Sequence, residues 1–231
     1  KARGGRPEPP EGLPGIGLSS QCRQGSGVLV GMIDSGFDPN LPESDGAGVD
    51  YFGVAVPGRD IEVRANPLDF HYRHGNGTWH HGTRVGARIA GQAEGVAPKA
   101  TLAVAAALTD IDEDGRPACD VSQVNVALQW LVTNEFRGGD RVGCDVINAS
   151  LSVETRSDED RRGLRFAFSL AGANQVLIVC AVPATENYYR GHIGPLAANP
   201  STLAVGALDL QGRFAGNNTY CRVSNHTSVV N

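Results

Sequence analysis

Short apolar runs alternate with segments of helical length along most of this chain, and this alternation restricts the fold more than any other feature of the sequence. A buried parallel strand is a short apolar run bounded by turn residues, whereas an amphipathic helix repeats its apolar positions with helical period. The predicted strands cover residues 28–34, 100–108, 144–153, 175–182 and 202–208, and the predicted helices cover residues 81–92, 121–136 and 158–173. Strands that alternate with helices form a mostly parallel sheet with helices on both faces, because the crossovers are right-handed. We therefore predict an α/β fold with three layers.

A polar stretch over residues 38–79 separates the first predicted strand from the first predicted helix. It contains Pro, Gly, Asn and Asp throughout, which predicts surface loops with at most one short strand. In the first helix, the small or apolar residues of the predicted packing face are Val85, Gly86, Ile89 and Ala90. In the second helix, the corresponding residues are Val124, Leu128, Leu131 and Val132.

Length and composition indicate one domain. A chain of 231 residues with 41% hydrophobic residues can bury a single core of ordinary size. Residues 1–20 are rich in Pro, Gly and charge, which predicts an extended N-terminal arm or linker ahead of a domain over residues 21–231. The longest apolar runs are well short of the roughly 18 residues that a membrane helix needs. We therefore expect a soluble domain that has no membrane partner.

Charge and cysteine spacing exclude two other classes of function. The formal net charge is −5 and the 20 Lys and Arg residues are scattered, so the basic patch of a nucleic-acid-binding protein is absent from the sequence. The five cysteines lie far apart without any CxxC pair, which excludes the usual zinc spacings. Cys180 falls within an apolar run, so we predict a buried and unreactive thiol.

Candidate site residues gather at one edge of the predicted sheet. In open α/β sheets, sites lie beyond the carboxyl ends of the strands, and Asp34 closes the first strand while His81 opens the first helix. An aspartate placed there can accept the Nδ1 proton of a histidine, fix its tautomer and stabilise the imidazolium. Two other interpretations remain open, a solvated loop carboxylate for Asp34 and a helix-capping or surface role for His81. A metal site formed by His81 with His74 and His80 matches no known ligand spacing.

Several segments carry a family resemblance. They read VLVGMIDSGFD, HGTRVGARIAG followed by GVAPKATL, DVINASLS and NPSTLAVGALD. In this order they resemble the subtilisin-like serine peptidase (subtilase) family, over a span from about Val28 to Asp209. The His-Gly-Thr helix start with GVAP a short distance later is the most specific of these motifs, whereas Asp-Ser-Gly after an apolar strand is weak alone. The resemblance implies the subtilisin-like three-layer fold.

The resemblance also implies roles for individual residues. Asp34 would be the aspartate of a catalytic triad and His81 its general base, while Ser150, Leu151 and Ser152 would form the segment that pairs with the backbone of a peptide substrate. The implied function is that of a serine endopeptidase that hydrolyses peptide bonds through an acyl-enzyme. Such a reaction needs neither a cofactor nor a metal, and the implied partner is a peptide or protein substrate.

Two motifs depart from the family pattern, and both concern catalysis. The place of the oxyanion asparagine falls on Ala184, and Asn187 is the nearby candidate for that role. The family nucleophile lies in Gly-Thr-Ser, whereas this chain has His226 before Thr227 and Ser228. Three explanations remain open: the chain is cut before the true serine, Ser228 is a degenerate nucleophile, or the domain is a catalytically inactive relative.

These explanations leave two functions from different classes. One is a serine endopeptidase, and the alternative is a catalytically inactive subtilase-like domain that binds a peptide or a protein partner. The candidates for completing the domain are a C-terminal segment and a second chain. A nucleotide-binding domain is excluded because Gly25 and Gly27 precede the first strand, whereas a phosphate-binding loop needs its glycines after the strand.

Overall fold

The computed structural model describes residues 24–70, 72–74, 77–111, 117–136, 139, 141–153, 155, 157–182 and 194–206. The N-terminal arm expected over residues 1–20 lies outside this part of the chain. Within it, a seven-stranded sheet in the order β13-β12-β11-β1-β6-β2-β3 forms the centre of the fold. Its strands are β1 (Leu29–Asp34), β2 (Tyr51–Ala55), β3 (Ile61–Val63), β6 (Thr101–Ala106), β11 (Val146–Ala149), β12 (Leu177–Ala181) and β13 (Thr202–Val205).

The sheet is parallel except for its edge strand β3, which is antiparallel to β2. β1 lies in the middle between β6 and β11, and every residue of β1 is buried. Because side chains alternate between the faces of a strand, Leu29 and Ile33 join one hydrophobic cluster while Val30 and Met32 join another. The same alternation puts Asp34 on the side of Val30 and Met32.

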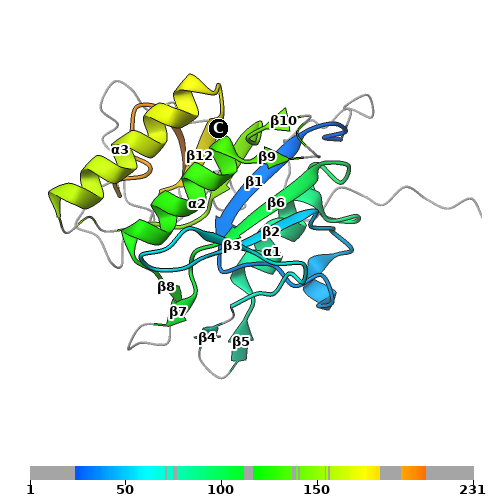
Figure 1. Ribbon diagram of the computed structural model, residues 1–231. Coiled ribbons are helices and arrows are strands. Elements are labelled where there is room, and N and C mark those ends of the chain that lie inside the picture. Colours follow the sequence, from blue (N-terminus) through cyan, green and yellow to red (C-terminus); the bar gives the residue numbers. More distant parts are fainter. Residues whose placement is uncertain are drawn as a thin grey trace, which may run out of the picture.

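In the described residues three α-helices cover the two faces of the sheet, and Figure 1 shows their arrangement. They are α1 (His81–Ala90), α2 (Val121–Thr133) and α3 (Asp158–Ala173). α2 and α3 lie together on the front face in this view, and α1 lies behind the sheet. The α3 helix begins with reciprocal hydrogen bonds, in which Ser157 and Asp160 each accept from the backbone N–H of the other. Such a capping box satisfies two N–H groups that the helix itself leaves unpaired.

The remaining elements are short. They are the 3-10 helix η1 (Pro42–Ser44) and the two-stranded ladders β4 (Tyr72–His74) with β5 (Gly77–Trp79), β7 (Asp110–Ile111) with β8 (Pro117–Ala118), and β9 (Glu135–Phe136) with β10 (Arg141–Val142). In Figure 1, the β4–β5 and β7–β8 ladders project from the edge at which β1 and β6 end. This is the edge at which the sequence predicts the site.

The three-layer α/β prediction is confirmed, and the structure corrects or completes three of its details. The described part of residues 38–79 contains four strands, β2 to β5, rather than loops with at most one short strand, and β2 is a buried strand that pairs with β6. Its five residues YFGVA include a glycine, so the apolar run is too short to stand out from the polar sequence around it. The predicted packing face of α1 is incomplete, because Gly82, Thr83 and Ala87 are buried along with Gly86 and Ala90, while Val85 and Ile89 pack half-buried against the same core.

The third correction concerns the predicted strand over residues 144–153. β11 ends at Ala149, opposite Ile33 of β1. The chain of β1 turns away soon afterwards at Gly36, which has a φ of +117°, a conformation that only glycine adopts readily. Because its partner leaves the sheet, Ser150 and the residues after it follow β11 outside any strand.

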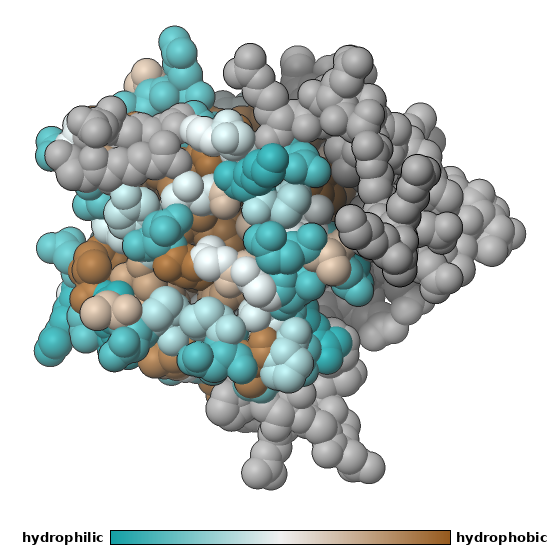
Figure 2. Space-filling view, turned by 90° about the vertical axis from the view of Figure 1, so that its right-hand side faces the viewer, coloured by the Kyte–Doolittle hydropathy of each residue, from teal (hydrophilic) through white to brown (hydrophobic). Residues whose placement is uncertain are grey.

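The outer surface mixes residue types. Hydrophobic residues appear between hydrophilic ones over the face drawn in Figure 2, rather than as one unbroken patch. None of the helices in the described residues has the length and apolar character required to cross a membrane.

Candidate active site

Asp34 and His81 meet at the carboxyl end of the central strand. The Nδ1 atom of His81 lies 2.6 Å from Oδ1 of Asp34. Asp34 is the last residue of β1 and His81 the first residue of α1, so the sheet and the helix each fix one partner. The Asp34 side chain is fully buried, whereas 30% of the His81 side chain is exposed. Since Nδ1 binds the carboxylate, Nε2 is the ring nitrogen left for another group.

The electrostatics of this pair come from burial and from two carboxylates. Burial lowers the pKa of His81, but the hydrogen bond and charge of Asp34, together with the charge of Asp69, outweigh it and raise the pKa above its usual value. Burial also raises the pKa of Asp34, although the hydrogen bonds from His81 and the Ser35 backbone offset part of this effect. The raised pKa of His81 favours the protonated imidazole, the form that a general base acquires when it takes a proton.

A buried polar cluster lies next to the pair. Ser35 donates its hydroxyl to Asp69 at 2.7 Å, and Asp69 accepts both the backbone N–H and the hydroxyl of Thr83 at 2.8 and 2.6 Å. No sequence motif predicted this cluster. Ser35 lies within the Asp-Ser-Gly motif, but Asp69 sits in a polar stretch with no periodicity and nothing in a single sequence places it beside β1.

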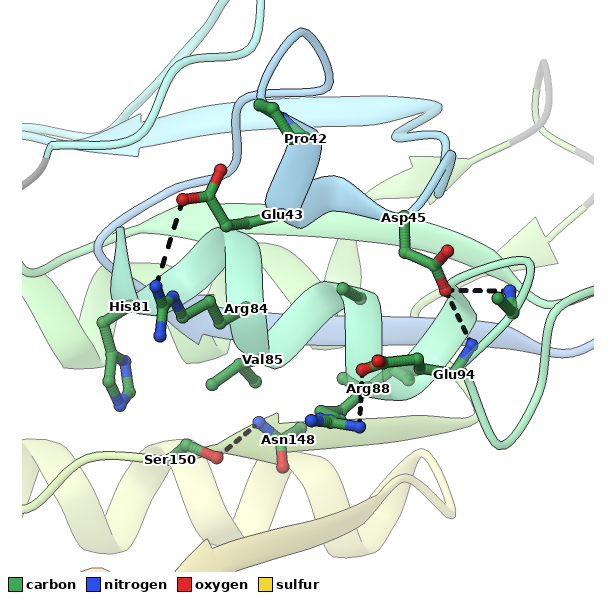
Figure 3. A pocket seen from close by; sticks show the side chains of 13 residues that line it. Pro42, Glu43, Asp45, His81, Arg84, Val85, Arg88, Glu94, Asn148 and Ser150 are labelled. Carbon is green, nitrogen blue, oxygen red and sulfur yellow. Dashed lines mark hydrogen bonds and ion pairs between the residues drawn. The ribbon is translucent and has the colours of Figure 1, made fainter. Parts of the chain in front are cut away.

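A groove opens beside His81, between α1 and β11. Its volume is about 770 Å³. In Figure 3, the side chains of His81, Val85 and Arg88 point from α1 toward β11 and the segment after it, which carry Asn148 and Ser150, whereas Arg84 points to Glu43. Two ion pairs lie along its rim, Arg84 with Glu43 at 3.9 Å and Arg88 with Glu94 at 2.6 Å. The half-buried Val85 and Ile89 of α1 thus pack against the core on this face of the sheet and also line the open groove.

The segment after β11 borders the same groove. Ser150 accepts a hydrogen bond from the Asn148 side chain at 2.9 Å, and both residues line the groove. Leu151 and Val153 are buried in the core on the α2 and α3 side, which anchors the segment to the body of the fold. The structure therefore brings Asp34, His81 and Ser150 to one edge, as the sequence predicts. Ser228 and the candidate oxyanion residue Asn187 lie outside the described residues.

Neither metal ligands nor a reactive thiol are found near this site in the described part of the chain. No group of three or more His, Cys, Asp or Glu side chains there is arranged to hold a metal ion. Cys180 is buried in the core, and burial raises the pKa of its thiol to about 12. A thiol with so high a pKa is a poor nucleophile.

Similarity to known proteins identifies the family of this chain. The chain matches the subtilase family over residues 25–230. The chain belongs to the subtilase family. The predicted resemblance and the subtilisin-like fold are both confirmed by this match and by the solved structures described next.

Two named subtilases show what fraction of a relative's length this chain covers. The subtilisin-like protease PopC of Myxococcus xanthus is 27% identical over 210 residues, which cover 85% of this chain and 41% of PopC. Subtilisin E of Bacillus subtilis is 30% identical over 205 residues, which cover 86% of this chain and 45% of subtilisin E. The chain thus spans less than half the length of these curated relatives.

Solved structures share the fold at lower identity. The prenylagaramide maturation protease PagA superposes with a TM-score of 0.61 at 22% identity, over 86% of this chain and 60% of PagA. A cold-adapted subtilisin-like serine proteinase does so with a TM-score of 0.59 at 18% identity, over 89% of this chain and 63% of the proteinase.

Proposed function

We propose that this subtilase domain is the Asp-His part of a serine endopeptidase that hydrolyses peptide bonds through an acyl-enzyme. The observation that carries the proposal is the 2.6 Å contact between His81 Nδ1 and the buried Asp34 carboxylate. A histidine held in this way presents Nε2 to a serine hydroxyl, takes its proton during attack on the scissile carbonyl, and returns it to the leaving amine. Asp34 orients the ring and stabilises the imidazolium.

The groove and the segment beside it support a peptide substrate. Residues 150–152 follow β11 outside any strand, and an extended peptide can pair with such a segment as an added strand. Anchoring by the buried Leu151 would hold the segment still while Ser150 and Ser152 border the substrate. This role for the three residues is part of the proposal, as is the treatment of residues 21–231 as one peptidase domain.

The nucleophile is the least determined member of the triad. We propose that it is Ser228 or a serine on a segment C-terminal to this chain, and that Asn187 supplies the oxyanion contact. A side-chain amide aimed at a developing oxyanion contributes roughly 3–4 kcal/mol to transition-state stabilisation. The second candidate function, an inactive domain that binds a peptide or protein partner, is favoured by the departures at Ala184 and His226 from the family motifs.

Labelling with a fluorophosphonate serine-hydrolase probe separates the two functions. The probe would be applied to this chain and to the longest form of the protein, with the modified residue identified by peptide mass spectrometry. The matched control is the His81→Ala variant of each form. Labelling of one serine that is lost in His81→Ala supports the peptidase and names its nucleophile. The inactive alternative predicts no labelling of either form.

A further inference from the structure

The first turn of α1 is capped by groups from outside the helix. A helix leaves its first N–H groups without internal partners, and the usual partner is a side chain of the preceding N-cap residue. Here the N-cap residue His80 makes no such bond. Instead the N–H of Gly82 donates to Ser35 Oγ at 2.9 Å, and the N–H of Thr83 donates to Asp69 Oδ2 at 2.8 Å.

The hydrogen bonds around Asp69 have a fixed direction. Ser35 Oγ accepts from Gly82 and lies closer to Asp69 Oδ1, at 2.7 Å, than to Asp34 Oδ1, at 3.3 Å. Its one hydroxyl proton therefore goes to Asp69. Thr83 gives Asp69 both its N–H and its hydroxyl. Asp69 thus accepts three hydrogen bonds, one from the loop that follows Asp34 and two from the helix that begins with His81.

Backbone contacts hold Asp69 in place. Phe70 N donates to the carbonyl oxygen of Ser35 at 2.7 Å, and Phe37 N donates to that of Leu68 at 3.0 Å. Packing is equally close on the helix side, because a Cβ on Gly82 would overlap the carbonyl oxygen of Gly36. Ser35, Asp69 and Thr83 have exposed fractions of 0%, 6% and 0%. Hydrogen bonds to a buried carboxylate are among the stronger ones in proteins, so the two ends of the catalytic pair are joined rigidly.

We propose that Asp69, acting through Ser35 and Thr83, is a positioning residue that fixes the distance between Asp34 and His81. It also places a second negative charge near the imidazole. The consequence for catalysis rests on the proposed function, whereas the positioning itself does not. Charge supports this role, because Asp34 and Asp69 both raise the pKa of His81 against the lowering effect of burial. The other charged groups beside His81 in the groove, Arg84 and Glu43, are paired with each other.

Titration of His81 by NMR tests the proposal and does not require an active serine nucleophile. The six histidines would be followed by ¹⁵N-imidazole spectra of the whole chain, with His81 assigned by its absence in His81→Ala. In Asp69→Asn we expect a lower pKa for His81 and a weakened Nδ1–H resonance, because one charge is lost and the first turn is released. Thr83→Val should weaken the Nδ1–H resonance in the same way, and Thr83→Ser, which keeps the hydroxyl, should restore it.

A buried threonine elsewhere provides the control. Thr202 donates its hydroxyl to the carbonyl oxygens of Leu196 and Asn199 at the start of β13. Thr202→Val removes comparable hydrogen bonds and should leave the His81 titration unchanged. Cooperative unfolding of each variant would establish that it is folded, and Ser35→Ala is the second variant should Asp69→Asn fail this criterion.

Turnover of the longest form of the protein separates this proposal from the proposed function. Asp69→Asn should lower kcat by about 10- to 100-fold with little change in KM, because a misplaced general base costs rate rather than affinity. A shifted His81 titration in a protein that the fluorophosphonate probe never labels would support the positioning role and reject the peptidase. Normal labelling with an unmoved His81 pKa and Nδ1–H resonance in folded Asp69→Asn would overturn the positioning role.

Discussion

The face of the central sheet under α2 and α3 is closed by apolar side chains, whereas the face under α1 combines a smaller core with buried polar groups and an open groove. Leu128, Leu131 and Phe168 pack with the sheet on the first face. On the second face, Met32 and Phe37 form the core, while Asp34, Asp69 and Thr83 are buried beside it. Dispersion and apolar burial act without direction, whereas the polar groups fix distances through hydrogen bonds.

The difference between the two faces indicates which one stabilises the fold and which one carries the candidate catalytic groups. The α2 and α3 face can supply most of the folding free energy because it buries mostly apolar side chains, and its fully buried Gln123 is hydrogen-bonded to the Ala55 carbonyl oxygen and the Thr109 hydroxyl. The α1 face buries fewer apolar side chains, but it holds the Asp34 carboxylate 2.6 Å from the His81 imidazole. We therefore expect substitutions on the first face to change stability alone and substitutions on the second face to change chemistry.

The largest expected effect is that of Asp34→Asn on the α1 face. Turnover of the longest form should fall by about 10⁴-fold, the scale on which loss of a triad aspartate acts. The pKa of His81 should fall as well, because the hydrogen bond and charge of Asp34 raise it. The control is Asp145→Asn at the opposite end of the sheet, where Asp145 accepts the N–H of Leu29 at 2.8 Å. Equal loss of turnover in both variants would contradict a special role for Asp34.

The next effect concerns Cys180, a thiol on the α2 and α3 face. Its pKa is raised from 9.0 to about 12 by burial, which reduces the thiolate fraction by about 10³-fold at neutral pH. Iodoacetamide should therefore modify Cys180 much more slowly in the native protein than in urea, as measured by peptide-resolved mass spectrometry. Similar rates in the two conditions would show that this face is not closed.

Stability provides the third test of the difference between the faces. Leu131→Ala should reduce the free energy of unfolding by about 2–5 kcal/mol, because Leu131 is fully buried and truncation leaves a cavity. The His81 titration should not move. Ile89→Ala on α1 is the matched control. Since Ile89 is half-buried beside the groove, this substitution should reduce the free energy of unfolding by less. A larger loss for Ile89→Ala would reverse our assignment of the stabilising face.

The smallest effect is expected at the rim of the groove. Glu43 and Arg84 form an exposed ion pair at 3.9 Å, and exposed pairs contribute about 1 kcal/mol at most. Glu43→Gln should change the denaturation midpoint only slightly, with a smaller change at high salt. A strong, salt-independent loss of stability would mean that this pair is part of the folded core.

The sequence predicted the elements that carry regular patterns. β1 and α3 follow from an apolar run and from a helical period with acidic residues in the first turn, and both were found close to the predicted bounds. Asp34 and His81 were predicted because each marks the end of such an element. The prediction allowed one short strand within residues 38–79 but did not place β2, because a five-residue strand with a glycine has no visible period, although its pairing with β6 buries it.

The buried polar cluster of Ser35, Asp69 and Thr83 could not be predicted, for a different physical reason. Asp69 acts through tertiary contacts with Ser35 and Thr83, and those contacts depend on a loop path that no local pattern specifies. The packing face of α1 was predicted correctly at Val85 and Ile89, which pack against the core. The sequence did not show that these residues also line a groove, because helical periodicity indicates that a face is apolar and not what covers it.

The pH dependence of turnover tests the central claim most directly. Cleavage of a quenched fluorescent peptide library by the longest form of the protein would be measured against pH, beside the NMR titration of His81. A general base acts as neutral imidazole, so the rate should rise as pH increases through the raised pKa of His81 and should coincide with the NMR titration. Turnover that is absent at every pH, or that persists in His81→Ala, would contradict the assignment of Asp34 and His81 as a catalytic pair.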